Sequence, residues 1–340
     1  MTQPRQWLRL SLGLGITLVF VWLLLRSVDP VTIAMAFALI PGSAWAFGIV
    51  FLAAGYALRI LRWWLMLQAV DPDLPLDACV WPFLSSIAVN NLLPFRAGDV
   101  WRVVGFRHQL GAPRMRILGT LLIERLLDLM SLLGFFFVGL SLLPESRFPD
   151  TIIVMATWLA GLGAISLLLL VVLSPYLIAL MGKLSGSRLV AGSWLAKVID
   201  IHGTHLVSAF VALRSPIHAL LLVACSIACW TCEGAIFVIF AAASGTSLDH
   251  FAGWFAMSLG TLATLLPSSP GYLGTFDYFT MQGFIAFGAP EAQAAAVAIA
   301  VHLMLWFPLT LLGMGYLAST RFRNSPWTEP KAISTDRSSQ

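Results

Sequence analysis

Long apolar stretches separated by short polar connections dominate the pattern along the chain. A helix needs about 20 mostly apolar residues to cross the hydrocarbon core of a bilayer. Six stretches meet this requirement, at residues 7–25, 43–67, 117–143, 151–173, 217–243 and 291–317. Two shorter apolar stretches, 78–94 and 251–267, end at a proline and are each followed by a second arm. The pattern predicts an all-α integral membrane protein with six transmembrane helices and two re-entrant helical hairpins.

The amino-acid composition strengthens this interpretation. Of the 340 residues, 59% are hydrophobic and only 11% are charged, whereas soluble domains carry roughly 25% charged residues. The first apolar stretch is not followed by a small-x-small cleavage site, so we interpret it as a retained anchor and not as a signal peptide. We expect one transmembrane domain over residues 1–320, with halves at about 1–145 and 150–320, and a disordered cytoplasmic tail over 321–340.

Basic residues gather in alternate connections, which predicts the orientation. They cluster at the N-terminus, in 59–116, in 174–216 and in the tail, while the intervening loops are nearly neutral or acidic. The positive-inside rule then places both termini in the cytoplasm. The connection 59–116 contains Arg59, Arg62, Arg96, Arg102, Arg107, Arg114 and Arg116. A full crossing by 78–94 would put the arginine-rich segment that follows it outside the cell. We therefore expect this stretch to enter the membrane from the cytoplasm and return to the same side.

The second half of the chain echoes the first. Four features recur in the same order: the spacing from Trp81 to Pro94 and from Trp254 to Pro267, the glycines Gly98 and Gly271, the Gly-Ala-Pro sequences at 111–113 and 288–290, and Arg125 and His302. In each half the tryptophan precedes the proline by 13 residues. Each half would hold three spans and one re-entrant hairpin, and three is odd, so the halves would run in opposite directions. The echo therefore predicts an inverted repeat, in which the binding site lies near the midplane where broken helices meet.

Polar residues beside the first helix break are candidates for binding a substrate. The break at 94–98 leaves backbone groups unpaired at membrane depth, and such backbone is tolerated only where protein or a wet cavity surrounds it. Asn90 and Asn91 can hydrogen-bond a head group or a neighbouring helix. Arg96 and Arg102 carry planar guanidinium groups that suit a phosphate. The alternative is that arginines only fix orientation at the interface, which we favour for Arg107, Arg114 and Arg116.

Three charged residues, Glu124, Arg125 and Asp128, lie within one predicted span. Unpaired, each central charge costs roughly 2.5–3.5 kcal/mol on insertion scales. We expect Arg125 to pair with Asp128, and Glu124 to pair with an arginine of the re-entrant arm. Two interpretations remain open, a structural clamp on the re-entrant segment and direct handling of substrate or protons.

The second half has fewer charges. The turn 267–271 is expected to expose backbone amides that form an anion nest, and Glu233 requires a partner at mid-span. The predicted substrate-binding residues are Asn90, Asn91, Arg96, Asp99, Arg102, Glu124, Arg125, Asp128, Ser268, Ser269, Gly271, Asp277 and His302. The four cysteines lie within apolar runs and are interpreted as packing residues. We expect no metal, no cofactor and no catalytic residue, because the nucleotide-binding, zinc-protease and serine-hydrolase motifs are missing.

Three segments carry a resemblance to a known family. These are 91–102, with the sequence Asn-Leu-Leu-Pro-Phe-Arg-Ala-Gly-Asp-Val-Trp-Arg, then 124–128, and then 266–277. They resemble the flippase-like membrane domain of lysylphosphatidylglycerol synthases, in a stand-alone form without the aminoacyl-transferase domain. Asp99 and Asp277 stand where the family more often has glutamate. The resemblance implies movement of a lipid across the bilayer, with a phospholipid, a hopanoid or a polyprenyl-linked glycolipid as substrate.

Three functional hypotheses follow. The leading one is a lipid translocator of the bacterial inner membrane that carries a lipid with an anionic head group, which Arg96, Arg102 and the amides of 267–271 would contact. The rival is a membrane-embedded lipid or polyprenyl-phosphate transferase, with Asp99, Glu124 or Asp128 as base. The third is an accessory subunit of a lipid or glycan synthesis enzyme. The expected partners are a membrane lipid and either a second copy of the chain or a lipid-synthesis enzyme, and no nucleic acid.

Overall fold

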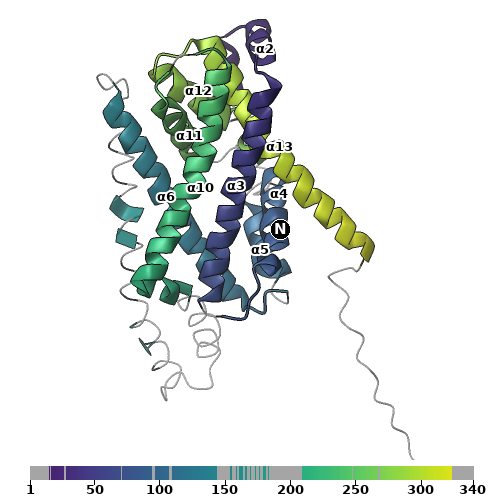
Figure 1. Cartoon of the computed structure of the whole chain (residues 1–340), viewed down its shortest axis with the longest axis vertical. Coiled ribbons are helices and arrows are strands. Elements are labelled where there is room, and N and C mark those ends of the chain that lie inside the picture. Colours follow the sequence, from purple (N-terminus) through teal and green to yellow (C-terminus); the bar gives the residue numbers. More distant parts are fainter. Residues whose placement is uncertain are drawn as a thin grey trace, which may run out of the picture.

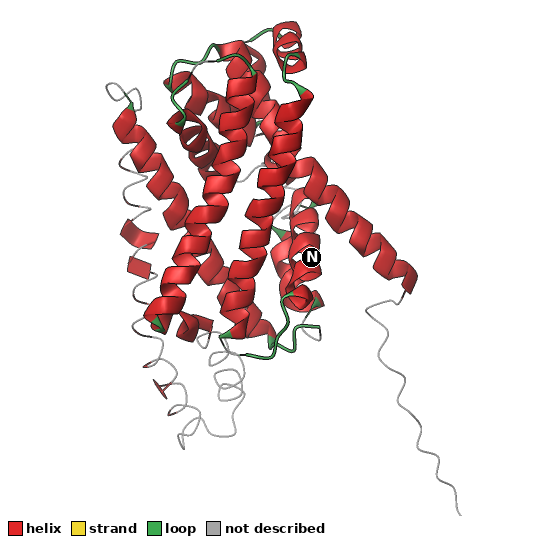
Figure 2. Cartoon of the chain, viewed as in Figure 1, coloured by secondary structure: helices red, strands yellow, loops and turns green. Residues whose placement is uncertain are grey.

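The computed structural model describes residues 15, 17–26, 28–69, 71–93, 96–106, 109–143, 209–246, 248–266 and 269–323, with isolated positions between 154 and 183. Most of the span predicted at 151–173 and part of that at 7–25 lie outside these residues. Every regular element in the described part is a helix (Figure 2). The prediction of an all-α protein is confirmed for these residues.

The elements are α2 (Pro30–Ala38), α3 (Gly42–Gln68), α4 (Asp77–Leu92), α5 (Ala97–Gly105), α6 (Arg114–Leu142), the 3-10 helix η2 (Ala209–Arg214), α10 (Pro216–Ala243), α11 (Phe251–Ala263), the 3-10 helix η3 (Pro270–Tyr272), α12 (Thr275–Ala286) and α13 (Glu291–Arg323). In Figure 1 α3 and α10 run side by side along the long axis, and α13 crosses behind them and projects from the bundle.

Three described helices are long and apolar enough to cross a membrane, namely α3, α10 and the part of α13 up to residue 319. A fourth crossing would result if the helix at 17–26 and α2, which are bent by 83° relative to each other, form one broken span. Helix α6 has 29 residues, about 43 Å at 1.5 Å per residue, but it is not among these candidate spans. The structure thus shows a multi-pass membrane protein, with fewer clear spans in its described part than the six predicted.

Proline and the residue before it set several helix boundaries. Helix α4 ends at Leu92, and Leu93 is extended with φ −111° and ψ 145°. Pro94 follows, and the ring of a proline disfavours the helical conformation of the preceding residue.

A carboxylate caps a helix in the second half of the chain. Asp277 in the first turn of α12 accepts a hydrogen bond from the Gly274 amide at 2.8 Å and so caps that helix.

In two helical hairpins, α4 with α5 and α11 with α12, the helices approach so closely that only glycine fits at the contact. A Cβ atom added at Gly98 of α5 would overlap the carbonyl oxygen of Ser86 in α4. In the second hairpin, a Cβ atom at Gly260 of α11 would overlap the Thr280 hydroxyl of α12. The four helices have 16, 9, 13 and 12 residues, all below the roughly 20 residues that a crossing needs. In Figure 1 α11 and α12 lie beside the upper part of α10, and α4 and α5 beside the lower part of α3.

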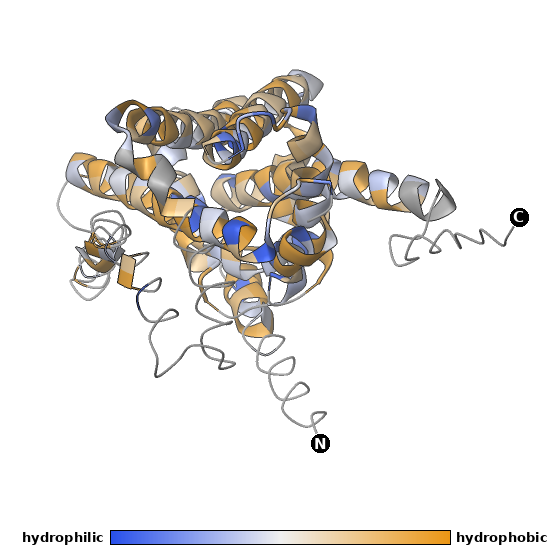
Figure 3. Ribbon diagram, turned by 90° about the horizontal axis from the view of Figure 1, so that it is seen from below, coloured by the Kyte–Doolittle hydropathy of each residue, from blue (hydrophilic) through white to orange (hydrophobic). Residues whose placement is uncertain are grey.

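Two apolar cores flank the centre of the molecule. One lies between α10, α11, α12 and α13 and includes Phe237, Phe240 and Phe284. The other lies between α3, α4, α6 and η2 and includes Trp63 and Phe83. Hydrophilic segments are few among the mostly hydrophobic helices in Figure 3. Polar side chains lie between the two cores, and packing of apolar side chains does not explain why they are there.

Candidate functional site

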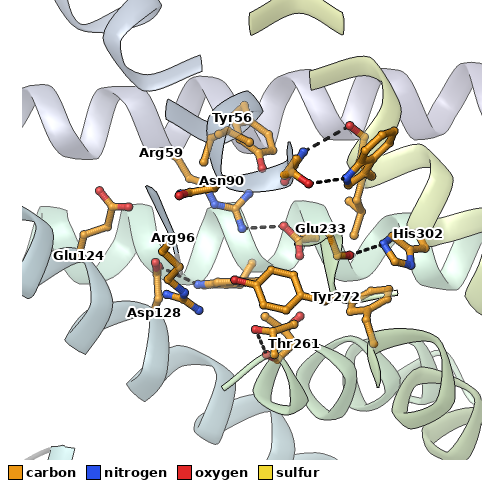
Figure 4. A pocket seen from close by; sticks show the side chains of 18 of the residues that line it. Tyr56, Arg59, Asn90, Arg96, Glu124, Asp128, Glu233, Thr261, Tyr272 and His302 are labelled. Carbon is orange, nitrogen blue, oxygen red and sulfur yellow. Dashed lines mark hydrogen bonds and ion pairs between the residues drawn. The ribbon is translucent and has the colours of Figure 1, made fainter. Parts of the chain in front are cut away.

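A cavity of about 210 Å³ lies where the two helix breaks meet (Figure 4). Its walls come from α3, α4, α6, α10, α11, η3, α12 and α13, so both halves of the chain contribute. The lining residues are Tyr56, Arg59, Phe83, Ile87, Asn90, Asn91, Arg96, Glu124, Arg125, Asp128, Trp230, Glu233, Thr261, Thr264, Gly271, Tyr272, Phe276, His302, Leu305 and Trp306. At about 30 Å³ of liquid volume per water molecule, this space would hold a small polar head group.

The backbone is strained at both breaks. Arg96 has φ 52° and Tyr272 has φ 58°, and in the described part of the chain they are the two non-glycine residues with positive φ. Such a conformation is uncommon outside glycine and costs of the order of 1–3 kcal/mol, which is typical of binding and switch regions. Both side chains line the cavity. The strain is therefore concentrated where the two halves converge.

An ion pair joins α3 to α10 across the cavity wall. The Arg59 Nη2 atom lies 2.6 Å from Glu233 Oε2. The guanidinium also lies 5.0 Å from the ring centre of Tyr56 and 4.5 Å from that of Trp230. This contact supplies the partner that Glu233 requires. The sequence prediction missed it, because Arg59 was assigned to the basic connection that sets the orientation. The available signal was the presence of arginine inside the apolar stretch 43–67.

Asp128 has a different partner from the one predicted. Its Oδ1 atom accepts hydrogen bonds from Arg62 Nη1 at 2.7 Å and from Trp230 Nε1 at 3.0 Å. Arg62 Nη1 also lies 2.7 Å from the Ser226 hydroxyl of α10. The expected partner, Arg125, approaches Asp128 only to 3.9 Å. Arg62 is fully buried, so the main interaction of Asp128 links α6 to α3 and α10.

Glu124 pairs with Arg102 of α5, the helix that follows the first break, as predicted for an arginine of this arm. Its Oε2 atom lies 2.9 Å from Arg102 Nη1, and Arg102 Nε donates to the Ser86 hydroxyl at 3.2 Å. The rings of Trp63 and Phe83 lie 4.9 and 4.4 Å from the Arg102 guanidinium, whose side chain has no exposed surface. Arg102 thus lies behind Glu124 and is not part of the cavity lining.

Arg125 and Asp99 form the contact between the cavity and the arm. Arg125 Nη2 lies 3.0 Å from both carboxylate oxygens of Asp99. Asn90 donates to the same carboxylate at 3.0 Å and accepts from the Gly98 amide at 2.7 Å. Asn90 therefore spans the helix break and satisfies a backbone donor that the break leaves unpaired. The Arg125 side chain remains 36% exposed, the most accessible of these paired arginines.

Asn91 connects the first break to the last helix. Its side-chain amide donates to the Thr310 hydroxyl at 2.9 Å. In the second half, the Ser269 amide donates to the Thr17 hydroxyl at 3.0 Å, and the Ser269 side chain does not line the cavity. Ser268 lies outside the described residues. The structure thus describes this turn only from Ser269 onward, and the anion nest stays a prediction.

His302 and Asp277 form the corresponding pair of the second half. His302 Nδ1 lies 2.7 Å from Asp277 Oδ1, and Nε2 lies 2.9 Å from the Gly271 carbonyl oxygen. Asp99 and Asp277 follow the two breaks, and Arg125 and His302 are the residues that the sequence repeat relates. Each of these two side chains binds the carboxylate of its own half.

The fold and the site define a class of protein. This chain is a helical membrane protein with a polar cavity between buried ion pairs and two broken helical hairpins. It belongs to the family described as the lysylphosphatidylglycerol synthase TM region, whose model matches residues 10–313.

Two curated relatives match most of the chain. The UPF0104 membrane protein MJ1078 of Methanocaldococcus jannaschii is 23% identical over 249 residues, which cover 71% of this chain and 98% of that protein. Glycosyltransferase AglD of Haloferax volcanii is 27% identical over 288 residues, which cover 73% of this chain and 44% of that protein. The chain therefore spans less than half of the glycosyltransferase.

Proposed function

We propose that this chain is a lipid translocator that moves a lipid across the inner membrane of the cell. The observation that carries the proposal is the polar cavity at the meeting point of two broken helical hairpins inside an apolar bundle. Ionisable groups at membrane depth are expensive and usually mark a pathway or a binding site. A head group would enter this cavity while the acyl chains remain in the lipid.

The topology we propose has six spans, two re-entrant hairpins and both termini in the cytoplasm. The inverted repeat is supported by the Arg125–Asp99 and His302–Asp277 contacts, in which each of the two residues related by the repeat binds a carboxylate that follows the helix break of its own half. It is also supported by the two hairpins, each of which combines helices too short to cross the membrane. A site between inverted repeats gives equivalent access from either side when one half rocks against the other.

The ion pairs would hold the walls of the cavity and define its two arrangements. Arg102 and Glu124 fix α5 against α6, and Arg59 and Glu233 fix α3 against α10. Arg125 is the exposed member of the set and would exchange partners between Asp99, Glu124 and Asp128, which lie at 3.0, 3.8 and 3.9 Å. A bistable element of this kind is what alternating access requires.

The second candidate function is a transferase that uses a lipid-linked donor. It is favoured by the relative named glycosyltransferase AglD, although the chain spans only 44% of that protein. Against it, Asp99, Glu124 and Asp128 are each bonded to an arginine. These contacts occupy carboxylate oxygens that a general base would need in order to reach its substrate. The third candidate, an accessory subunit of a synthesis enzyme, predicts neither translocation nor chemistry by the pure chain.

The experiment that separates these functions uses the purified chain in liposomes that contain one labelled phospholipid. Mass spectrometry of the recovered lipid reports chemistry, and the label accessible from outside reports translocation. Translocation with unchanged lipid mass supports the proposal, and a new lipid mass supports the transferase. If neither translocation nor a new lipid mass exceeds that of protein-free liposomes, the accessory role is the candidate that remains.

A further inference from the structure

The arginines around the cavity are matched by carboxylates, apart from one. Four pairs are complete, namely Arg59 with Glu233, Arg62 with Asp128, Arg102 with Glu124, and Arg125 with Asp99. Each pair joins one positive and one negative charge, so the four pairs add no net charge to the cavity.

The His302–Asp277 pair is also neutral, and the hydrogen bonds show why. The Gly271 carbonyl is only an acceptor, so Nε2 of His302 must carry a proton. A second proton must lie between Nδ1 and Asp277 Oδ1, which are 2.7 Å apart. The pair is then either imidazolium with carboxylate or imidazole with carboxylic acid. Its net charge is zero in both forms.

Arg96 is the cation that remains. It lines the cavity from the strained break between α4 and α5, and it makes no hydrogen bond or ion pair within the described part of the chain. Asp99, whose carboxylate feels the charge of Arg96 at longer range, is already bonded to Arg125 and Asn90. Arg96 is half-buried, and a charge that has lost part of its hydration is stabilised by a counter-ion. The ion pairs and Arg96 together give the cavity a net charge of +1, which one negative charge would neutralise.

A second polar group of the cavity is also without a partner. The hydroxyl oxygen of Thr261 is buried and has no hydrogen-bond partner among the described residues. Buried polar groups are normally hydrogen-bonded, and an exception calls for an explanation such as a ligand. Thr261 lies on α11 and Arg96 on the opposite hairpin, and both line the cavity with Tyr272 (Figure 4). A guanidinium and a hydroxyl from the two halves together suit the oxygen atoms of a phosphate.

We infer that the cavity binds a lipid phosphodiester with one net negative charge, held by Arg96 and by the Thr261 hydroxyl. The inference rests on the proposed translocation, since it names the class of head group that the cavity takes. It places the anion on Arg96 and excludes Arg102, whose guanidinium is already occupied by Glu124 and Ser86. A neutral diacylglycerol would leave the charge of Arg96 unmatched. A phosphocholine lipid would pair its phosphate with Arg96 but would bring in a choline cation, so the net charge of +1 would remain.

The test is equilibrium binding of short-chain lipids to the purified chain in neutral detergent. Dioctanoyl phosphatidylglycerol is the probe, and dioctanoylglycerol and dioctanoyl phosphatidylcholine are the comparison ligands. We use Arg96→Asn, because asparagine tolerates positive φ, and Arg96→Lys, which keeps the charge. Arg114→Asn is the matched control, since it removes an exposed arginine outside the cavity. Thr261→Val is a second variant, which removes the unpartnered hydroxyl and keeps a side chain of similar size.

We expect wild type to prefer phosphatidylglycerol over both comparison ligands by about tenfold, a difference of 1.4 kcal/mol. Arg96→Asn should abolish this preference, Thr261→Val should weaken it, and Arg96→Lys and Arg114→Asn should keep it. Equal affinity for the three lipids in wild type would overturn the inference, as would an unchanged preference in folded Arg96→Asn or in Thr261→Val. Translocation of labelled phospholipid without this preference would reject the inference about the head group and leave the proposed translocation standing. Binding with the preference but no translocation would reject the proposed function and keep the site.

Discussion

Arg62 donates a hydrogen bond to Asp128 at 2.7 Å and so joins α3 to α6 inside the bundle. Both side chains are buried, and Trp230 of α10 donates to the same carboxylate oxygen at 3.0 Å. Three long helices therefore meet at one carboxylate. This contact lies beside the cavity, which makes the stability of the bundle and the shape of the cavity depend on the same residues.

The first prediction concerns this pair. Asp128→Asn or Arg62→Gln alone leaves a buried partner without its counter-charge, which typically costs about 3–5 kcal/mol. Each single variant should lower the melting temperature in detergent. The double variant should lose clearly less than the sum of the two, because no unpaired charge remains.

The control for this pair is Asp73→Asn, which makes the same change at an exposed position of the α3–α4 loop. It should leave the melting temperature unchanged. Additive losses in the double variant would show that Arg62 and Asp128 do not interact in the folded protein.

The second prediction concerns Arg102. Arg102→Lys keeps the charge but cannot reach both Glu124 and the Ser86 hydroxyl as the guanidinium does. The variant should therefore be less stable than wild type and should yield less folded protein. Arg114→Lys at an exposed position should behave as wild type. Full tolerance of lysine at position 102 would support the alternative that this arginine only sets orientation.

The third prediction concerns the packing of the first hairpin. Gly98→Ala would place a methyl group on the carbonyl oxygen of Ser86, so α4 and α5 would have to separate. Overpacking of this kind typically costs about 1–3 kcal/mol, and more where backbone must move. Gly134→Ala in α6 is the matched control, because a Cβ atom there meets no other atom within 4 Å. Equal melting temperatures for the two variants would argue against the close approach of α4 and α5.

Local rules predicted much of the fold. Pro94 predicted the end of α4 because a proline restricts the residue before it, and Leu93 is extended. The pairing of Glu124 with an arginine of the arm was also predictable, since a buried carboxylate needs a partner and the arm follows closely in sequence. The shortness of α11 follows from the length of its apolar stretch.

The tertiary contacts of α3 were not predictable from the sequence. Arg59 and Glu233 are 174 positions apart, and nothing local indicates that they meet. Arg59 and Arg62 lie near the end of the apolar stretch 43–67, so the sequence analysis assigned them to the basic connection that sets the orientation. Packing of α3 against α10 instead buries both guanidinium groups. The same packing gives Asp128 an arginine from another helix in place of its neighbour on α6.

The fourth prediction tests the proposed topology. In a chain without its four native cysteines, which are free thiols, single cysteines are placed at Asp73 and His250, in the loops before α4 and before α11. An inverted repeat with cytoplasmic termini puts residue 73 in the cytoplasm and residue 250 outside. A membrane-impermeant maleimide on intact cells should label only position 250. Labelling of position 73 from outside, or of neither position from outside, would reject the arrangement.

The central claim is that lipid head groups pass through the cavity, and a blocked cavity tests it most directly. Thr264 lines the cavity, whereas the neighbouring Leu265 is 56% exposed and lies outside its lining. Purified wild type, Thr264→Trp and Leu265→Trp are compared in liposomes that contain a head-group-labelled phospholipid, at equal amounts of folded protein. We expect wild type and Leu265→Trp to move the lipid at the same rate and Thr264→Trp to be slower by at least about tenfold, or 1.4 kcal/mol in the barrier. Wild-type translocation by Thr264→Trp, or wild-type liposomes no faster than protein-free ones, would contradict the account.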